Sequence, residues 1–242
     1  MAIPEVTVIS GTESPVGDGV TKPNRCLVRM PDGSVRKAIV KELSTKALAA
    51  EIFCAHLLRG WGLSTPEVAT VKGSKSALAS LDIGYPSLKQ QLNFQQSLPG
   101  TIKKLLEKKG AVLVASFPET PRAIAVDEAI ANRDRNFGNI LWDGANVAWI
   151  DHDRALDLTN DLDLNRLANF VLISGADHGK IAASAAACAM QLYASSVADA
   201  AKQCSSLGVS EFGLQVSGRL GRLAQKVLER FPVPDDLLKT ST

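Results

Sequence analysis

The most informative run of this sequence is Asn132-Arg-Asp-Arg-Asn-Phe-Gly-Asn-Ile-Leu-Trp-Asp-Gly-Ala-Asn-Val-Ala-Trp-Ile-Asp151. Its second half predicts a β-hairpin, because Gly144 suits the first central position of a two-residue type II′ turn. Such a turn pairs Asp143 with Asn146 and fixes the register of the strands on either side. A polar loop therefore leads directly into a short hairpin of defined register.

That register brings three polar side chains together. Asn139 is expected opposite Ile150, so Asn139 and Asp151 meet at one end of the hairpin, and Asp134 lies in the loop just before it. Such hard oxygen ligands suit Mg²⁺ or Mn²⁺. A metal held by Asn139 and Asp151 could bridge nucleotide phosphates, while Asp134 accepts a proton from an attacking hydroxyl. The competing interpretation is an ordinary turn, in which Asp and Asn side chains bond their own backbone.

A second group of residues points to the same chemistry. Lys41 ends a predicted strand, and in the helix that follows Glu51 shares a face with Leu48, Ala55 and Leu58. A carboxylate within an apolar stripe needs a partner, and Lys41 is the candidate. A Lys–Glu pair that positions phosphates is what a nucleotide kinase needs. The alternative is a solvated Glu51 at the edge of the stripe, with Lys41 free.

The remaining sequence divides into a β-rich part and a mainly helical part. Residues 1–41 predict strands, with Pro31-Asp-Gly33 as a hairpin turn. A helix capped by Ser44 or Thr45 is expected to end at Arg59, and a strand follows. A connection near Gly84 marks the expected boundary between an N-terminal unit, residues 1–84, and a C-terminal unit, residues 85–242. Helices are predicted over residues 102–109, 122–132, 162–173, 179–203 and 213–230.

Composition limits the class of function. Hydrophobic residues make up 45% and charged residues 21%, which is typical of a folded globular protein. The net charge of +2 argues against nucleic acid or a membrane surface as a direct partner. The four cysteines form no CxxC pair, so a thiolate metal site is not expected. No signal sequence is evident and Ile181–Ala198 is too weakly apolar to predict a membrane span, so we expect a cytoplasmic protein.

Two blocks of the sequence resemble the HipA-like kinases, relatives of the phosphatidylinositol kinases within the protein-kinase-like fold. In the first block, Ile39-Val-Lys41 and the run Ala50–Pro66 resemble the lysine strand and the glutamate helix of that family. In the second, Asn132–Asn139 followed by Trp149-Ile-Asp151 resembles its catalytic and metal motifs. The spacing of the polar residues in the second block is the most specific part of the match.

The resemblance implies an α+β, bilobal protein-kinase-like fold, with a small β-rich N-lobe and a mainly helical C-lobe. It also implies an ATP- and Mg²⁺- (or Mn²⁺-) dependent kinase that transfers the γ-phosphate to a hydroxyl, commonly of a protein serine or threonine. By this resemblance Asp134 is the catalytic base, and Asn139 and Asp151 hold the metal. Lys41 contacts an ATP phosphate, and Glu51 holds Lys41.

The loop Ser10–Gly19 would lie over the phosphates, because it precedes the first predicted hairpin. Its glycines do not fit a GxGxxG pattern, but the backbone N–H groups of Ser10, Gly11 and Thr12 could still cradle phosphate. The alternative is a surface loop without a binding role.

Three further expectations follow from the resemblance. Asn136 stands where the family usually has a histidine, which leaves open a non-catalytic module that binds nucleotide or a partner. A small-molecule kinase or nucleotidyl transferase of the same fold is also open. Since several family members act as toxins in toxin–antitoxin systems, the expected partners are a phosphate-acceptor protein and an antitoxin or regulatory protein.

Overall fold

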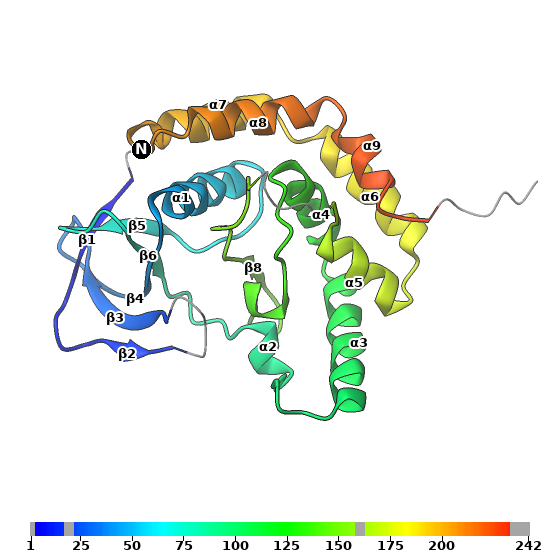
Figure 1. The fold of residues 1–242 in the computed structure, drawn as a ribbon, viewed down its shortest axis with the longest axis horizontal. Helices are drawn as coiled ribbons and strands as arrows, with labels where there is room; N and C mark the ends of the chain where they lie inside the picture. Colours follow the sequence, from blue (N-terminus) through cyan, green and yellow to red (C-terminus); the bar gives the residue numbers. More distant parts are fainter. Residues whose placement is uncertain (1–2, 17–21, 158–162, 233–242) are drawn as a thin grey trace, which may run out of the picture.

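A computed structural model of the chain describes residues 3–16, 22–157 and 163–232 (Figure 1). The protein is a mixed α and β structure. Strands dominate up to Leu81 and helices dominate after it, in the order that the sequence predicts.

The N-terminal part is a six-stranded sheet with the strand order β1-β5-β6-β4-β3-β2. Strand β1 also pairs with β3, so the sheet curls back on itself. The predicted hairpin at Pro31-Asp-Gly33 is confirmed: it joins β3 to β4, and Gly33 has the positive φ of +83° that the turn requires. The strands are β1 (Glu5–Val8), β2 (Ser14–Pro15), β3 (Asn24–Arg29), β4 (Val35–Glu42), β5 (Val68–Val71) and β6 (Ala77–Leu81).

Helix α1 (Thr45–Gly60) lies between this sheet and the helical part of the molecule (Figure 1). Its predicted cap is confirmed, because the Ser44 side chain accepts a hydrogen bond from the Ala47 backbone N–H at 3.2 Å. Most of α1 is buried, which explains why its apolar residues extend over more than one face. The helix therefore belongs to the larger core, which also takes in Val68 and Leu78 from the sheet, while a smaller core of sheet residues has no α1 member.

The C-terminal part contains most of the helices and one short hairpin. Its larger core includes residues of α1 and of the helices from α3 to α9. The elements are α2 (Leu88–Gln91), α3 (Gly100–Ser116), α4 (Thr120–Ala129), the 3₁₀ turn η1 (Phe137–Asn139), β7 (Ile140–Trp142), β8 (Val147–Trp149), α5 (Arg166–Ser174), α6 (His178–Met190), α7 (Ala194–Gln203), η2 (Ser205–Leu207), α8 (Ser210–Leu220) and α9 (Leu223–Leu228).

Two of the predicted helices are each broken in two. The helix predicted over residues 179–203 is α6 followed by α7, with a bend of 63° between them. The carbonyl of Tyr193 in this break accepts a hydrogen bond from the Trp61 indole at 3.2 Å, a tertiary contact that the alanine-rich sequence does not reveal. The helix predicted over residues 213–230 is likewise α8 followed by α9.

Helix α3 is longer than predicted and approaches the candidate site loop closely. A Cβ atom at Gly110 would lie 2.6 Å from the Phe137 ring, which is closer than packed atoms can approach. Glycine at this position therefore allows α3 to pack against the turn that leads into the hairpin.

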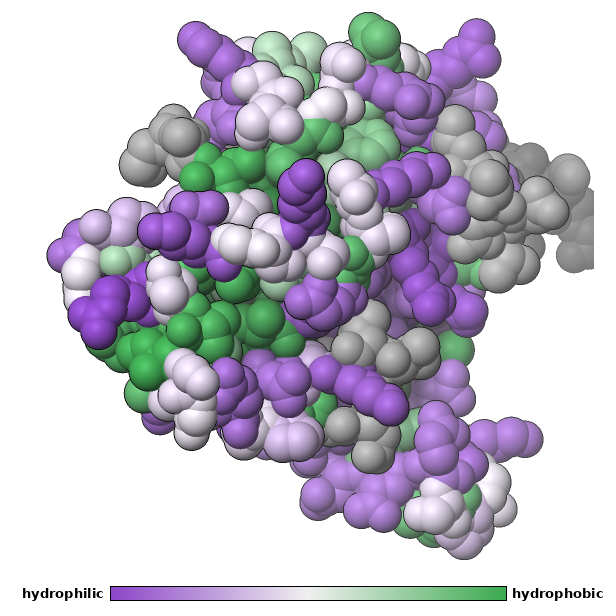
Figure 2. Space-filling model, turned by 60° about the vertical axis from the view of Figure 1, so that its left-hand side comes forward, coloured by the Kyte–Doolittle hydropathy of each residue, from purple (hydrophilic) through white to green (hydrophobic). Residues whose placement is uncertain are grey.

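The surface and the helix lengths add two observations. On the face that Figure 2 brings forward, apolar side chains lie among charged ones. Within the described ranges, no single helix combines the length and apolar composition needed to cross a membrane, and α6 with α7 meets those criteria only as a bent pair.

Candidate active site

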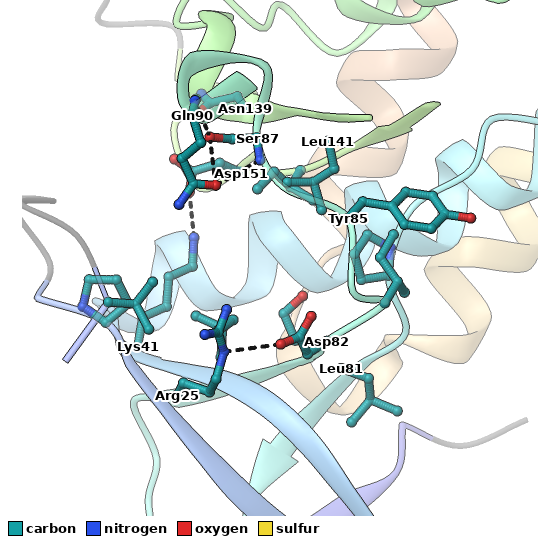
Figure 3. A pocket seen from close by; sticks show the side chains of 18 of the residues that line it. Arg25, Lys41, Leu81, Asp82, Tyr85, Ser87, Gln90, Asn139, Leu141 and Asp151 are labelled. Atoms are coloured by element: carbon teal, nitrogen blue, oxygen red, sulfur yellow. Dashed lines mark hydrogen bonds and ion pairs between the residues drawn. The ribbon is translucent and has the colours of Figure 1, made fainter. Parts of the chain in front are cut away.

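A cavity of about 300 Å³ lies between the sheet, the connection after β6 and the β7–β8 hairpin (Figure 3). This volume is at the lower end of what small-molecule sites enclose. Its lining is mixed, with aliphatic side chains beside charged ones. The lining residues are Val16, Pro23, Arg25, Ile39, Lys41, Glu51, Pro66, Ser80, Leu81, Asp82, Ile83, Tyr85, Ser87, Gln90, Gly138, Asn139, Leu141, Ile150 and Asp151.

The hairpin has the predicted register. The Ile150 N–H donates to the Asn139 carbonyl at 3.1 Å, and the Asp143 N–H donates to the Asn146 carbonyl at 3.3 Å. Gly144 has φ +106°, as its position in the turn requires. Asn139 therefore lies at the same end of the hairpin as Asp151, and both line the cavity.

The loop before the hairpin is held by its own side-chain amides. The carbonyl of Asp134 accepts hydrogen bonds from the side-chain amides of Asn136 and Asn139, each at 3.1 Å. Asn136 also accepts from the Gly138 N–H at 2.8 Å, so asparagine closes the loop at the position where histidine is usual in the resembled family. Since the amide nitrogen of Asn139 is engaged, its amide oxygen is the atom available to a cation.

The carboxylate of Asp134 lies near the site but outside the residues that line the cavity. It forms an ion pair with Arg154 at 3.3 Å, and both side chains are about half exposed. The Asp134 backbone N–H donates to the Asn132 side chain at 3.2 Å, which fixes the start of the loop. An acceptor molecule arriving from solvent could therefore reach this carboxylate.

Lys41 reaches across the cavity from β4 and contacts the segment after the hairpin (Figure 3). Its Nζ lies 2.5 Å from an Asp151 oxygen and 3.7 Å from an Asp153 oxygen. Burial alone would lower the pKa of Lys41, but the nearby carboxylates of Glu51, Asp151 and Asp153 raise it above its usual value. The ammonium therefore stays charged at neutral pH.

The predicted Lys41–Glu51 ion pair needs a correction. Lys41 makes its ion pairs with Asp151 and Asp153, while a Glu51 oxygen accepts a hydrogen bond from the backbone N–H of His152. The reason is geometric: Glu51 is nearly fully buried and is satisfied by that N–H. Burial opposes the charge on Glu51, but Lys41 and His152 together hold its pKa below the usual value.

Backbone geometry is unusual at Asp151. This residue has φ +66°, a left-handed conformation that non-glycine residues seldom adopt. The conformation turns the chain sharply between β8 and the buried His152, which directs the Asp151 side chain into the cavity (Figure 3). Such strain is concentrated at functional sites, where the surrounding structure enforces it.

Arg135 is the residue of the site that the sequence did not reveal. It is buried and binds the Asp127 carboxylate on α4 through two nitrogens, at 2.9 and 2.7 Å. Its third nitrogen donates to the carbonyls of Asn139 and Ile150, at 3.1 and 2.8 Å, and so ties the base of the hairpin to the helix. A clue was present in the sequence, because Asp127 lies in a helix that is otherwise largely apolar.

His152 connects the Arg135 network to Glu51. An Arg135 nitrogen lies 3.0 Å from the His152 Nε2 atom, and because arginine can only donate, Nε2 must accept. A neutral His152 then carries its proton on Nδ1, which faces a Glu51 oxygen at 3.8 Å. Glu51 on α1, His152 after the hairpin and Arg135 in the loop that contains Asp134 therefore form one continuous series of buried polar contacts.

The structure does not bring Ser10, Gly11 and Thr12 to the cavity. These residues form a turn between β1 and β2, where the Thr12 hydroxyl donates to the Ile9 carbonyl at 2.6 Å and accepts from the Leu27 N–H at 3.0 Å. None of the three residues lines the cavity, and the Thr12 hydroxyl and N–H bond neighbouring backbone, so the geometry gives their predicted phosphate contact no support. The rest of the predicted loop, from residue 17 onward, lies outside the described residues.

The acidic residues beside Lys41 suit a divalent cation. Glu51, Asp151 and Asp153 place three carboxylates near one ammonium, and burial together with Asp151 raises the pKa of Asp153. A bound cation would offset this excess of negative charge. Among the described residues no cluster of three or more His, Cys, Asp or Glu side chains has metal-binding geometry. The Asn139 amide oxygen and the Asp151 carboxylate are oxygen donors of the kind that Mg²⁺ accepts, and both residues line the cavity.

Comparisons with known proteins agree with this geometry. A family model described as HipA-like kinase matches residues 9–205. The structure is similar to the Helicobacter pylori proinflammatory kinase CtkA, with 14% identity, a TM-score of 0.50, and coverage of 90% of this chain and 95% of that one.

It is also similar to HipA of Shewanella oneidensis MR-1, solved in a complex with HipB and operator DNA. There the identity is 13%, the TM-score is 0.56, and the match covers 90% of this chain and 68% of that one. At these identities the likeness concerns the fold. A search of curated proteins found no match.

Proposed function

The chain belongs to the HipA-like kinase family, and we propose that it transfers the γ-phosphate of ATP to a hydroxyl acceptor at the cavity beside the β7–β8 hairpin. The observation that carries the proposal is the convergence of Lys41, Asn139 and Asp151 on this cavity. Lys41 comes from the sheet, 110 positions before Asp151 in the sequence. Local sequence alone would not bring these two side chains together.

The cavity offers different surroundings to the two ends of ATP. The aliphatic side chains of Ile39, Leu141 and Ile150 suit the flat, apolar faces of a purine base. The charged end, at Lys41, suits the triphosphate, because a buried ammonium attracts phosphate oxygens. ATP bound in this direction would replace part of the Lys41–Asp151 contact.

Asn139 and Asp151 are the residues that would hold the magnesium ion. When bound, the ion would draw charge from the phosphate oxygens and help to align the γ-phosphate for transfer. Asp153, 3.7 Å from Lys41, would keep that lysine oriented while Asp151 turns to the metal. Each of these residues thus has a task that its present contacts support.

Asp134 is the group that we propose to receive the proton. The acceptor oxygen forms its bond to the γ-phosphorus as the bond to the β,γ-bridging oxygen breaks, and ADP leaves. The acceptor's hydroxyl proton passes to the Asp134 carboxylate. The Arg154 ion pair is compatible with this role, because both side chains are half exposed and can be displaced by an acceptor.

We further propose that the two parts of the molecule are the lobes of a protein-kinase-like fold. The boundary near residue 84 falls in the connection between β6 and α2, and Asp82, Ile83 and Tyr85 of this connection line the cavity. Residues 1–84 would form the N-lobe and residues 85–242 the C-lobe. A ligand at this connection would contact both lobes.

The acceptor we favour is a serine or threonine of a protein. The half-exposed Asp134 supports an acceptor that approaches from solvent rather than one enclosed in the cavity. Because the Shewanella HipA structure contains HipB, we propose an antitoxin-like regulatory protein as a second partner. A cytoplasmic, toxin-type kinase would fit both proposals.

Labelled ATP tests the proposed reaction. We expect the wild-type chain with Mg²⁺ to transfer label from γ-labelled but not from α-labelled ATP, either to itself or to a serine- and threonine-containing protein substrate. Asp134→Asn and Asp151→Asn should each lower the rate by about a hundredfold or more, and only the second should weaken binding of Mg-ATP. Glu67→Gln, on an exposed pair with Arg36 away from the cavity, is the matched control.

The other outcomes separate the alternatives. Transfer of α-label would identify a nucleotidyl transferase, and transfer only to a small molecule would identify a small-molecule kinase. Tight Mg-ATP binding without any transfer would identify a non-catalytic module. Equal rates for the wild type and both aspartate variants would contradict the site itself.

A further inference from the structure

A second cluster of charged side chains lies beside the candidate active site, outside the cavity. Glu128, near the end of α4, accepts hydrogen bonds from Arg230 at 3.0 and 2.7 Å and from Arg133 at 3.2 and 3.3 Å. Arg230 follows α9 and also donates to the backbone carbonyl of Asp163 at 2.8 Å and to its carboxylate. Arg133 lies 3.5 Å from the same carboxylate. Two guanidinium groups therefore join two carboxylates.

Burial and charge make this cluster more than a surface ion pair. The side chain of Glu128 is 5% exposed and both arginines are 12% exposed, whereas Asp163 is 70% exposed. Burial raises the pKa of Glu128, but the hydrogen bonds from Arg230 and Arg133 outweigh it and lower the pKa below its usual value. Paired guanidinium and carboxylate groups in fork geometry also fix orientation.

The members of the cluster come from segments that the proposed reaction needs. Arg133 directly precedes Asp134, and Asp163 lies three residues before α5. Arg230 comes from the end of the chain, and α9 packs against α4 and α6. The family model matches residues 9–205, so Arg230 lies outside the matched residues.

We propose that Arg230 is a positioning residue for phosphotransfer: by binding Glu128 and Asp163 at once, it holds the end of α4, from which the loop with Asp134 departs, against Asp163 just before α5. This inference rests on the proposed function. Arg230 does not line the cavity, so its loss changes alignment rather than ATP binding. A displacement of the order of 1 Å at a reacting group can slow a reaction about a hundredfold.

Steady-state kinetics of Arg230→Gln test the proposal. We expect kcat to fall about 10- to 100-fold while KM for Mg-ATP changes less than about threefold. Arg230→Lys should recover part of the rate, since it keeps the charge but loses the fork. Asp163→Asn should lower kcat less, and the double variant should be less than additive because both residues act through one contact.

Lys226→Gln is the matched control, because Lys226 lies on α9 and its ammonium makes its ion pair with the exposed Glu229, at 2.8 Å, rather than with Glu128 or Asp163. Its kinetics should equal those of the wild type. Equal kcat for Arg230→Gln and the wild type would overturn the proposal. So would a parallel loss in Lys226→Gln, because that would indicate general loosening of α9.

A second measurement keeps this test separate from the proposed function. Hydrogen exchange of the wild type and of Arg230→Gln, both without nucleotide, needs no catalytic activity. Amides of residues 131–136 and 163–166 should exchange faster in the variant, while those of the sheet stay unchanged. Unchanged exchange at these amides would overturn the positioning role even in an active kinase. Faster exchange in a chain without transferase activity would support the role and reject the reaction.

Discussion

Asp134 stands between two arginines whose surroundings are opposite. Arg135 is 1% exposed and binds Asp127, the hairpin backbone and His152, all within the part of the chain that matches the family. Arg133 faces the outer cluster, which is completed by Arg230 from beyond that part. We call these the inner network and the outer cluster.

The difference separates two tasks. The inner network supplies a donor to the Ile150 carbonyl and a second donor to the Asn139 carbonyl, which also accepts from the Ile150 N–H, so we expect it to stabilise the base of the hairpin. The outer cluster joins the end of α4 to Asp163 mainly through side chains, so we expect its loss to change the position of these segments more than the overall stability. Substitutions in the inner network should therefore lower the unfolding free energy most, and substitutions in the outer cluster should mainly lower the rate of phosphotransfer.

The largest expected effect is that of Arg135→Met. This change leaves the buried Asp127 carboxylate without its cationic partner and removes the Arg135 hydrogen bonds to the carbonyls of Asn139 and Ile150. Breaking a buried ion pair from one side costs about 3–5 kcal/mol, and we expect a loss of unfolding free energy in that range by urea titration. Arg230→Met should cost clearly less. Equal losses in the two variants would remove the distinction between the two clusters.

A double variant sharpens this comparison. Asp127→Leu together with Arg135→Met removes both charges, and replacing a buried pair by apolar residues is often close to neutral. We expect the double variant to regain part of the stability lost in Arg135→Met. It should still lack the Arg135 hydrogen bond to the Ile150 carbonyl, beside Asp151, so phosphotransfer should stay low. Full recovery of both stability and rate would show that the inner network is not required.

The sequence predicted the local parts of this site and missed the long-range ones. The hairpin register followed from Gly144, because one turn type fixes a strand pairing with period two. The roles proposed for Lys41 and Asp151 came from the hairpin register and the apolar stripe around Glu51, and the resemblance pointed the same way; the family match confirms the family, and the roles stay predictions. Residue spacing does not predict that Lys41 forms its ion pair with Asp151 rather than with Glu51. That partner depends on tertiary packing, in which Glu51 on α1 is buried.

The errors have physical causes that can be named. The turn at Ser10–Thr12 has the composition of a phosphate loop, but its hydroxyl serves the sheet. The alanine-rich run from residue 179 favours helix throughout, and a contact from Trp61 accompanies the break. The sequence assigned Arg135 no role, because its partners come from a helix, a loop and a hairpin that no single periodicity aligns. Propensity and pattern do not contain such tertiary contacts.

The loop before the hairpin also has an apolar contact, between Gly110 on α3 and the Phe137 ring. This contact tests whether the inner network and the outer cluster alone keep the loop in place. Gly110→Ala would place a Cβ 2.6 Å from the Phe137 ring and 2.9 Å from Leu92. Overpacking of this kind costs about 2 kcal/mol, and we expect that loss by urea titration. Because Phe137 begins the turn that ends at Asn139, Mg-ATP binding should weaken as well. Gly218→Ala, where a Cβ meets open space, is the control and should not lower stability.

Acid titration gives a smaller effect that belongs to the outer cluster. Since its arginines lower the pKa of Glu128 in the folded protein, this group stabilises the fold above its unfolded pKa, about 4.3. The contribution is lost as pH falls from there through the lower folded pKa. Glu128→Gln should therefore be less stable than the wild type at pH 7, by about 1 kcal/mol, and the gap should close in acid. A constant gap would contradict the charged pairing.

The smallest expected effect distinguishes two ways in which the C-terminal helices could act. Arg219 on α8 donates to the carbonyl of Ala129 at 3.1 Å, at the end of α4, and so touches the same helix as Arg230 without reaching Asp163. Arg219→Gln should cost about 0.5–1 kcal/mol of stability, as for other cations at a helix C-terminus, and leave kcat unchanged. If it instead lowers kcat as much as Arg230→Gln, the end of α4 alone controls the rate, and the link through Asp163 is not what aligns Asp134.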